Sequence, residues 1–246
     1  MLYRTLHDEH SPLVRRFAVN PHGRDLIVGD IHGCFGKLVS RLKRIGFDPH
    51  AGDRLFSVGD LIDRGSQSGT VLDWLDQSWF HAVLGNHEQM ALLWTAGELS
   101  DDTYIANGGE WFMRSHPARR QEIADRLGRL PVAIELATAH GMVGIVHADC
   151  PTRVWTDFTQ ALESLPDEEP LADLIEEAVW SRKRWFSPSE DEVEGVRAVV
   201  VGHTTRRDRI VIGNVIHIDT GAWIEDEERD FCVVDAATLE TVQGRP

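Results

Sequence analysis

The chain has 246 residues, of which 42% are hydrophobic and 26% are charged. This length and composition are typical of a folded domain with a large hydrophobic core, and they exclude a fibrous, low-complexity or largely disordered chain. Asp and Glu number 40 against 25 Lys and Arg, which gives a formal net charge of -15. Because such a charge repels nucleic-acid phosphates and anionic lipid headgroups, we expect neither a nucleic-acid partner nor a membrane partner.

The N-terminus and the cysteines indicate a compartment. Met1–His10 lacks the basic region and the apolar run of a signal peptide, and no stretch approaches the roughly 18 apolar residues of a membrane span. The three cysteines, Cys34, Cys150 and Cys232, are odd in number, far apart and in no CxxC pair. This usage is typical of a reducing compartment, so we expect a cytoplasmic protein.

The first predicted elements form a hairpin. Arg15–Val19 and Asp25–Gly29 are strand-like and flank Asn20–Gly23, whose proline and glycine suit a type I turn. No segment with the composition of a linker follows. We therefore expect a single domain over residues 1–246, with residues 1–24 as an N-terminal extension or hairpin.

Three strand–loop–helix units come next. Each begins with a short apolar strand that ends at a glycine and a polar residue, and the three strands are Leu26–Val28, Leu55–Val58 and Ala82–Leu84. Apolar residues at helical spacing then predict helices over Leu38–Ile45, with Gly46 as the C-terminal cap, over Val71–Leu75 and over Met90–Trp94.

The rest of the chain continues this pattern. Further β segments are predicted at Val143–His147, Val196–Gly202, Arg209–Ile212, Val215–Asp219 and Phe231–Asp235, and a helix from Leu171 to Trp180. The order of elements indicates an α/β fold. Asp101–His116 and Pro188–Gly195 carry turn residues and charge between regular elements, which makes them candidate rims of a site.

Side chains that can bind a metal follow the predicted strands at the points where the strands end. They are Asp30 and His32 after the first strand, Asp60 after the second, Asn86 after the third, and His147 and His203 after two later strands. Because the carboxyl ends of strands in an α/β sheet form one crevice, we expect these loops to converge. A single His after a strand is usually a core or loop residue. Five strands that each end at a residue able to bind a metal favour a binding site instead.

The chemistry of this set predicts a dinuclear metal centre. Two carboxylates, one Asn and three His, without a thiolate, suit two borderline divalent ions such as Mn, Fe or Zn better than a structural zinc. Asp60, by its central position, would bridge ions roughly 3.5–4 Å apart, and the shared water would be a hydroxide near neutral pH. Manganese is the first candidate.

Five motifs carry a resemblance to a known family. They are GDIHG at Gly29–Gly33, GDLIDRG at Gly59–Gly65, GNHE at Gly85–Glu88, HAD at His147–Asp149 and GHT at Gly202–Thr204. In these motifs the chain resembles the metal-dependent phosphoprotein phosphatases of the calcineurin-like superfamily, and most closely bacteriophage lambda protein phosphatase and its bacterial relatives. The resemblance runs from about Asp25 to Ala222. It implies a calcineurin-like metallophosphoesterase fold, an α/β sandwich of two sheets flanked by helices.

The resemblance also implies a division of the ligands and an activity. Asp30, His32 and Asp60 would hold one metal ion, and Asp60, Asn86, His147 and His203 would hold the second. The implied activity is hydrolysis of phosphomonoesters, above all phosphoserine and phosphothreonine in proteins, by in-line attack of a metal-bridging hydroxide. The expected partner is therefore a phosphorylated protein or peptide, while the oligomeric state stays open.

The remaining polar groups receive roles from their chemistry. His87 is placed to protonate the leaving oxygen, Asp63 would orient and charge it by hydrogen bonding, and Arg64 can clamp phosphate through its fork of donors. We also expect Asn86 to contact the substrate phosphate. The resemblance adds Arg182 as a second phosphate contact, although a surface charge at a helix end explains this residue equally well.

Leu84 departs from the family pattern. Many protein phosphatases of this family carry an Arg directly before Gly-Asn-His-Glu, and this Arg helps to hold the phosphate. With Leu84 at that position, we expect one positively charged side chain fewer around the substrate phosphate. Leu at this position resembles the symmetrical diadenosine tetraphosphatases, which makes hydrolysis of dinucleoside polyphosphates the alternative function. Those enzymes usually lack the pair formed by Asp63 and Arg64 and have Asp in place of Glu88, so a protein phosphatase is favoured. A catalytically silent fold that binds phosphoprotein is disfavoured by the intact ligand set and by His87.

Overall fold

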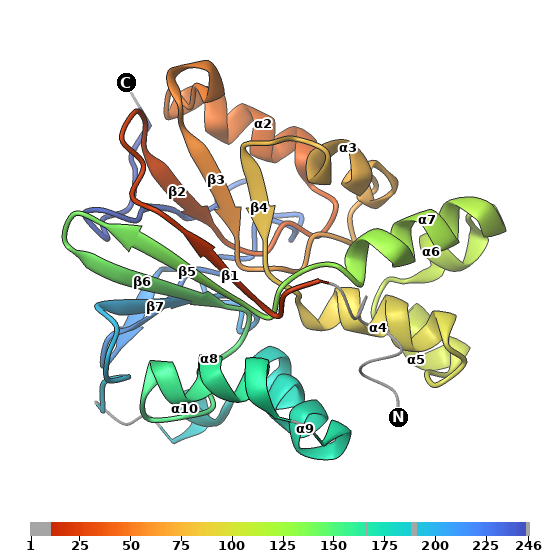
Figure 1. Cartoon of the computed structure of the whole chain (residues 1–246). Coiled ribbons are helices and arrows are strands. Elements are labelled where there is room, and N and C mark those ends of the chain that lie inside the picture. The colour runs from red at the N-terminus through yellow and green to blue at the C-terminus, as the bar shows by residue number, and fades with distance from the viewer. Residues whose placement is uncertain (1–10, 166, 188–190, 245–246) are drawn as a thin grey trace.

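The computed structural model describes residues 11–165, 167–187 and 191–244. Two β-sheets face each other, with helices on their outer sides (Figure 1). The spatial order of the six-stranded sheet is β1 (Val14–Phe17), β5 (Ala133–Thr138), β6 (Gly141–Val146), β7 (Ala198–Val201), β9 (Val215–His217) and β8 (Ile210–Ile212). That of the four-stranded sheet is β10 (Val233–Asp235), β2 (Asp25–Val28), β3 (Arg54–Ser57) and β4 (Phe80–Ala82). The predicted fold of two sheets flanked by helices is confirmed.

Strand direction brings the functional loops to one edge. β2, β3 and β4 are parallel neighbours in the smaller sheet, and β6, β7 and β9 are parallel neighbours in the larger one. The loops that leave the carboxyl ends of parallel strands emerge at the same edge of a sheet. The site described below is built from these loops.

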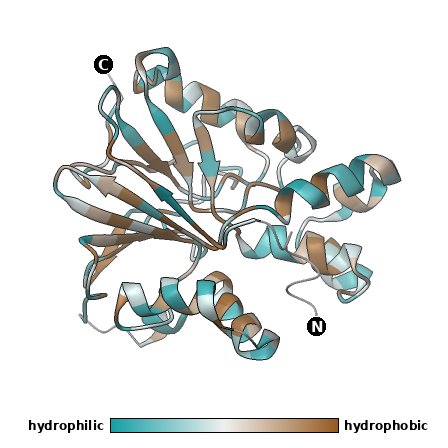
Figure 2. Ribbon diagram, viewed as in Figure 1, coloured by the Kyte–Doolittle hydropathy of each residue, from teal (hydrophilic) through white to brown (hydrophobic). Residues whose placement is uncertain are grey.

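The central strands bury both of their faces. In β2, Ile27 packs in a layer between the two sheets, while Leu26 and Val28 join the larger apolar cluster shared with the helices. Val200 and Val201 of β7 divide between the same two layers. Strands buried on both faces read as continuous apolar runs, which is why the sequence predicts them well. In Figure 2 the central strands are mainly hydrophobic in colour.

The outer layers consist of helices. They are α2 (Phe35–Arg44), α3 (Val71–Leu75), α4 (Asn86–Thr95), α5 (Asp101–Ala106), α6 (Glu110–Arg114), α7 (Pro117–Leu127), α8 (Trp155–Ser164), α9 (Glu168–Trp180) and α10 (Lys183–Phe186), with short 3-10 helices at Pro49–Ala51 and Ser68–Thr70. In Figure 1, α2 and α3 lie beside the four-stranded sheet, and α8 to α10 lie beside the six-stranded sheet. Among the residues that the structure describes, no helix has both the length and the apolar character needed to cross a membrane.

The predicted N-terminal hairpin is wrong. β1 pairs in parallel with β5 in the larger sheet, whereas β2 pairs with β3 and β10 in the smaller one. The expected turn is bound instead to the loop before β3, where the side chain of Asn20 donates to the carbonyl of Gly52 at 2.9 Å. The backbone N–H of Arg24 donates to Asp53 at 2.8 Å in the same region. These contacts fix the segment that connects β1 in the larger sheet to β2 in the smaller one.

Other elements differ from the prediction as well. β5, α7 and α8 have no counterpart among the predicted elements, and Asp101–His116, expected as an irregular rim, contains α5 and α6. Ser100 explains the start of α5, because its hydroxyl accepts a hydrogen bond from the backbone N–H of Thr103 at 3.2 Å. α4 begins at Asn86 rather than Met90, which places Asn86 and His87 in its first turn.

Candidate active site

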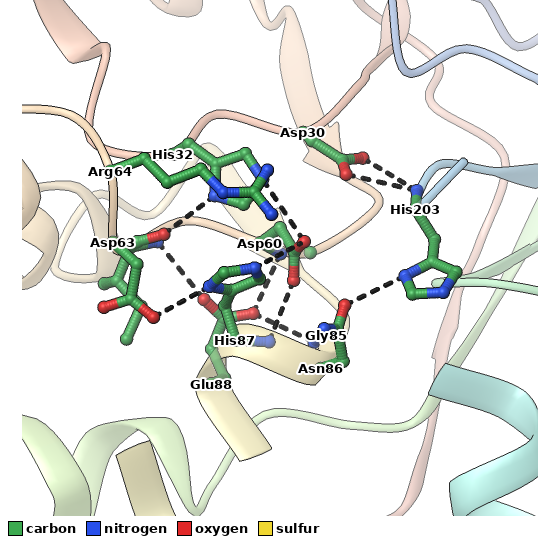
Figure 3. A network of polar contacts seen from close by, with 12 residues as sticks. Asp30, His32, Asp60, Asp63, Arg64, Gly85, Asn86, His87, Glu88 and His203 are labelled. Atoms are coloured by element: carbon green, nitrogen blue, oxygen red, sulfur yellow. Dashed lines mark hydrogen bonds and ion pairs between the residues drawn. The ribbon is translucent and has the colours of Figure 1, made fainter. Parts of the chain in front are cut away.

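The residues predicted to bind metal or substrate gather where the loops after β2, β3, β4, β6 and β7 meet. The loops bring together Asp30, His32, Asp60, Asp63, Arg64, Asn86, His87, His147 and His203, most of which are drawn in Figure 3. All of these except Arg64 are buried. A pocket of about 330 Å³ lies over this cluster, and Arg182 lines it from the segment between α9 and α10.

The backbone is strained at the site. Among the described residues, six other than glycine have a positive φ angle, and five of these are His32, Asp60, Asp63, Arg64 and His203. A residue with a side chain in this region costs about 1–3 kcal/mol and persists only where its surroundings fix it. The strain therefore coincides with the predicted functional residues.

Glu88 supplies much of this fixation. Its fully buried carboxylate accepts hydrogen bonds from the three backbone N–H groups of Asp60–Ile62 at 2.8 to 3.3 Å. It accepts another from the N–H of Gly85 at 2.9 Å. The loop after β3 is thereby joined to the first turn of α4.

Two glycines permit the close approach of these loops. A Cβ atom at Gly85 would overlap the backbone of Asp60, and one at Gly202 would overlap the carboxylate of Asp30. Neither position has space for a side chain unless the loops move apart.

Asp60 occupies the centre of the cluster. One carboxylate oxygen, Oδ2, lies 3.4 Å from Nε2 of His32 and 3.9 Å from Nε2 of His87. The other, Oδ1, lies 3.3 Å from Nε2 of His147. Figure 3 shows Asp60 between Arg64 on one side and His203 on the other. The two oxygens of Asp60 thus face different groups of ligand-type residues.

Three histidines each have one ring nitrogen next to a backbone carbonyl. The pairs are His32 Nδ1 with Ile62 at 3.0 Å, His147 Nδ1 with Val58 at 2.7 Å, and His203 Nε2 with Trp180 at 3.2 Å. Because a carbonyl oxygen only accepts, the ring nitrogen facing it carries the proton, and a neutral ring then has a lone pair on its other nitrogen. This hydrogen bonding orients a histidine for metal binding.

The lone pairs of His147 and His203 converge on Asn86. Its Oδ1 lies 2.9 Å from Nε2 of His147 and 2.9 Å from Nδ1 of His203. Burial lowers the pKa of both imidazoles, that of His203 to about 3, so both rings are neutral at neutral pH. Three electron-rich atoms therefore face one another with no proton between them, which is the donor arrangement of a cation site.

The carboxylates complete a donor set that fits divalent cations. Burial raises the pKa of Asp30 well above its usual range, and the charges of Asp219 and Asp60 raise it further. Among the described residues, no Lys or Arg forms an ion pair within 4.0 Å of the carboxylates of Asp30, Asp60 or Asp219. Two groups of potential ligands share Asp60, each with its ligand atoms within 4.8 Å of one another: His32, Asp60 and His87, and Asp30, Asp60 and His147. The first group contains His87, for which the sequence predicts the role of an acid.

His87 has a buried carboxylate partner. Its Nδ1 donates to Oδ2 of Asp63 at 2.8 Å. Oδ1 of Asp63 accepts from the indole of Trp111 at 2.8 Å and from the hydroxyl of Tyr104 at 3.3 Å. Burial lowers the pKa of His87, but the charge of Asp60 and the hydrogen bond to Asp63 outweigh it, so the pKa lies above its usual value. The contacts therefore favour a protonated ring at the floor of the pocket.

Positive charge lines the pocket. Nη1 of Arg64 lies 2.9 Å from Nε2 of His32, and its guanidinium lies 4.0 Å from the centre of the Trp223 ring. Arg182 and Arg206 also line the pocket. Three guanidinium groups thus stand around the buried cluster.

Leu84 does not face this pocket. Its side chain is fully buried in the larger apolar cluster, and its backbone N–H donates to the carbonyl of Pro131 at 2.8 Å. Leu84 is therefore not among the residues that line the pocket. Arg182 and Arg206 bring positive charge to the pocket from other loops.

Several residues of the site lie outside the sequence prediction. Asp219 follows β9 in the same way as the predicted ligands follow their strands, so the same rule applied once more would find it. Tyr104 and Trp111 have no local signal, although they lie in Asp101–His116, which does reach the site as expected of a rim. The other expected rim, Pro188–Gly195, differs. Residues 188–190 lie outside the described residues, and Asp191, Glu192 and Val193 of the same segment line a separate pocket.

Comparisons with known proteins agree with this geometry. Residues 24–207 match the model of the calcineurin-like phosphoesterase family. The chain is 40% identical over 199 residues to serine/threonine-protein phosphatase 1 of Salmonella typhimurium, covering 80% of this chain and 85% of the relative. A shorter match, 48% identical over 67 residues, covers 26% of this chain and 24% of the symmetrical bis(5'-nucleosyl)-tetraphosphatase of Methylobacillus flagellatus.

A solved structure extends the likeness to the fold. The cold-active protein-tyrosine phosphatase of a psychrophilic Shewanella species superposes with a TM-score of 0.61 at 20% identity, covering 94% of this chain and 82% of that chain. The family match spans most of the chain, and the two sheets with their converging loops agree with it. This chain belongs to the calcineurin-like phosphoesterase family.

Proposed function

We propose that this protein is a dinuclear, metal-dependent phosphatase that hydrolyses phosphomonoesters, with phosphoserine and phosphothreonine of proteins as its substrates. The observation that carries the proposal is the position of Asp60, whose two carboxylate oxygens face His32 and His147, beside a His87 paired with Asp63. The relationship to a bacterial serine/threonine-protein phosphatase over 80% of the chain supports this substrate class.

The buried donors would hold two divalent ions, with manganese as the first candidate. Asp30 and His32 would bind one ion, Asn86, His147 and His203 the other, and Asp60 both. When bound, the ions supply Lewis-acid stabilisation of the phosphate charge and lower the pKa of water. The carbonyls bound to the three His rings fix which nitrogen of each faces the ions.

His87 would donate a proton to the leaving oxygen. A serine or threonine alkoxide is a poor leaving group, so it needs a proton as the ester bond breaks. The hydrogen bond to Asp63 and the charge of Asp60 favour the protonated imidazole, which carries a proton on Nε2 as well as on Nδ1. A protonated ring cannot ligate a metal ion, and for this reason we assign His87 as the acid rather than as a ligand.

Arg64 and Arg182 would hold the substrate phosphate. Both line the pocket above the cluster, together with the side chain of Asn86. A guanidinium presents a planar fork of donors that matches two phosphate oxygens. Arg182 is exposed, so it can reach a substrate from the side of the pocket formed by the segment after α9.

Hydrolysis of dinucleoside polyphosphates is the second candidate. It is favoured by the match to a symmetrical bis(5'-nucleosyl)-tetraphosphatase, which is confined to 26% of this chain. The short match and the buried position of Leu84 weaken this candidate, because Leu84 does not line the pocket as a substrate contact would.

A substrate panel tests the proposal. The Mn²⁺-supplemented protein is assayed on a phosphoserine peptide and on diadenosine tetraphosphate, with His87→Asn as a control for contaminating phosphatases. We expect kcat/KM to be at least about tenfold higher on the peptide, and to fall in the variant. Faster cleavage of the dinucleotide would transfer the proposal to the second candidate, and equal peptide turnover by both proteins would assign the activity to a contaminant.

A further inference from the structure

The pocket carries more positive charge than a single phosphate group requires. Its described lining includes three guanidinium groups, from Arg64, Arg182 and Arg206, against one carboxylate, that of Asp60. The proposed function uses Arg64 and Arg182 and leaves Arg206 without a role. This local excess of positive charge occurs in a chain whose net charge is -15.

Arg206 is held firmly beside the catalytic cluster. It follows His203 in the loop after β7, and its backbone N–H donates to the carbonyl of Asp219 at 2.9 Å. The side chain of Arg229 donates to the carbonyl of Arg206 at 3.1 Å. The backbone of Arg206 is therefore fixed on both its N–H and its C=O.

The side chain of Arg206 rests on an aromatic ring. Its guanidinium carbon lies 3.6 Å from the centre of the Trp185 ring, within cation–π distance. Trp185 in turn contacts the ring of His217 in β9, with the ring centres 5.8 Å apart. The guanidinium is thus supported from the sheet and held in place at the wall of the pocket.

Among the described residues, no carboxylate pairs with the guanidinium of Arg206. Its Nε is also buried without a hydrogen-bond partner among them. The next residue offers a contrast, because Arg207 is exposed and pairs with Glu228 at 2.8 Å and with Asp226 at 3.6 Å. A stacked guanidinium with unused donors at the wall of a substrate pocket is suited to a carboxylate or phosphate.

We propose that Arg206, held over Trp185, determines specificity by binding an acidic side chain next to the phosphorylated residue of a peptide substrate. This inference rests on the proposed function and deepens it by naming acidic phosphopeptides as the preferred class. A pocket of about 330 Å³ is in the range of small-ligand sites, so it takes a neighbouring side chain together with the phosphate. The positive pocket also offsets the repulsion that an acidic peptide meets from the rest of the chain.

The test compares two phosphoserine peptides that differ only in having Glu or Gln on both sides of the phosphoserine. For the wild type, kcat/KM on the Glu peptide should exceed that on the Gln peptide about tenfold, mainly through KM, as for one charge-assisted hydrogen-bonded pair. Arg206→Gln should bring this ratio close to one, and Arg206→Lys should keep part of it. Arg207→Gln, the matched control, should keep the wild-type ratio. Both peptides are assayed with the same preparation, so any loss of folded protein cancels from the ratio.

Four outcomes would overturn the inference while leaving the proposed function in place. They are a wild-type ratio near one, an unchanged ratio in Arg206→Gln, an equal loss in Arg207→Gln, and a loss in Arg206→Gln on diadenosine tetraphosphate alone. The last outcome would assign Arg206 to a polyphosphate chain. If neither peptide is hydrolysed, the proposed function fails and the inference fails with it, whereas equal turnover of both peptides removes only the inference.

Discussion

The imidazole of His87 donates through Nδ1 to the carboxylate of Asp63 at 2.8 Å, and both side chains are buried, with His87 lining the pocket. Burial raises the pKa of Asp63, and the hydrogen bonds that its carboxylate accepts from His87 and Trp111 oppose this shift by favouring the ionised form; the hydroxyl of Tyr104 also donates to it. The pair therefore favours the protonated form of His87, as the proposed role of general acid requires.

Removing the charge of Asp63 should shift the pH profile. In the proposed role, His87 acts as an acid only while protonated, so activity should be present below its pKa and be lost as pH rises through it. Asp63 contributes to the raised pKa of His87, and Asp63→Asn should therefore move the alkaline limb of kcat/KM about 1–2 pH units lower. Trp111→Phe, which removes a neutral donor from Asp63 but keeps its charge, is the control and should leave the limb near its wild-type position. An alkaline limb that stays in place in Asp63→Asn would remove His87 from the acid role.

His87→Asn should affect substrates according to their leaving groups. General-acid help is worth roughly 10²–10⁴-fold when the leaving group is a poor one. The nitrophenolate of p-nitrophenyl phosphate leaves without a proton, whereas the alkoxide of phosphoserine does not. Steady-state kinetics should therefore show a larger loss on a phosphoserine peptide than on p-nitrophenyl phosphate. Equal losses would indicate that His87 positions the substrate or a metal ion instead.

Glu88→Gln should destabilise the fold rather than only slow the reaction. The amide of Gln presents donors as well as one acceptor to the N–H groups of Asp60–Ile62 and Gly85, so some of these buried donors lose their partner. We expect the free energy of unfolding in urea to fall by about 2–4 kcal/mol. Glu122→Gln is the control, because its exposed pair with Arg119 contributes about 0.5 kcal/mol or less. Equal stability of the two variants would contradict the anchoring role of Glu88.

The sequence predicts the buried strands well because their signal is local. Leu26–Val28 of β2 and Ala198–Val201 of β7 are continuous apolar runs, since each strand buries one face against the other sheet and one against helices. β5 lacks such a run because it contains Glu135, whose carboxylate accepts from the indole of Trp155 at 2.9 Å and from Arg16. The partners of Glu135 lie far from it in the sequence, so no local pattern predicts that this strand contains a polar residue.

The difference between local signals and contacts distant in the sequence also explains the wrong hairpin and the partly predicted site. The pairing of β1 with β5 joins Val14 to Ala133, a contact that no turn signal can reveal, while Asn20–Gly23 has the composition of a turn and points to the wrong partner. In the site, the predicted ligands are recognised by their place at strand ends. The contacts of Asp63 with Trp111 and Tyr104, and of Arg206 with Trp185, depend on helices brought together only in the folded chain.

The metal content of the wild type and of Asp60→Asn distinguishes a dinuclear centre bridged by Asp60 from any other arrangement. Both proteins are loaded with Mn²⁺ under the same conditions and analysed for elemental composition, with circular dichroism as the check on folding. Because the two oxygens of Asp60 face His32 and His147, we expect close to two ions per wild-type chain and fewer than one in the folded variant. A wild type that saturates at one ion, or a variant that still binds two, would contradict the dinuclear centre.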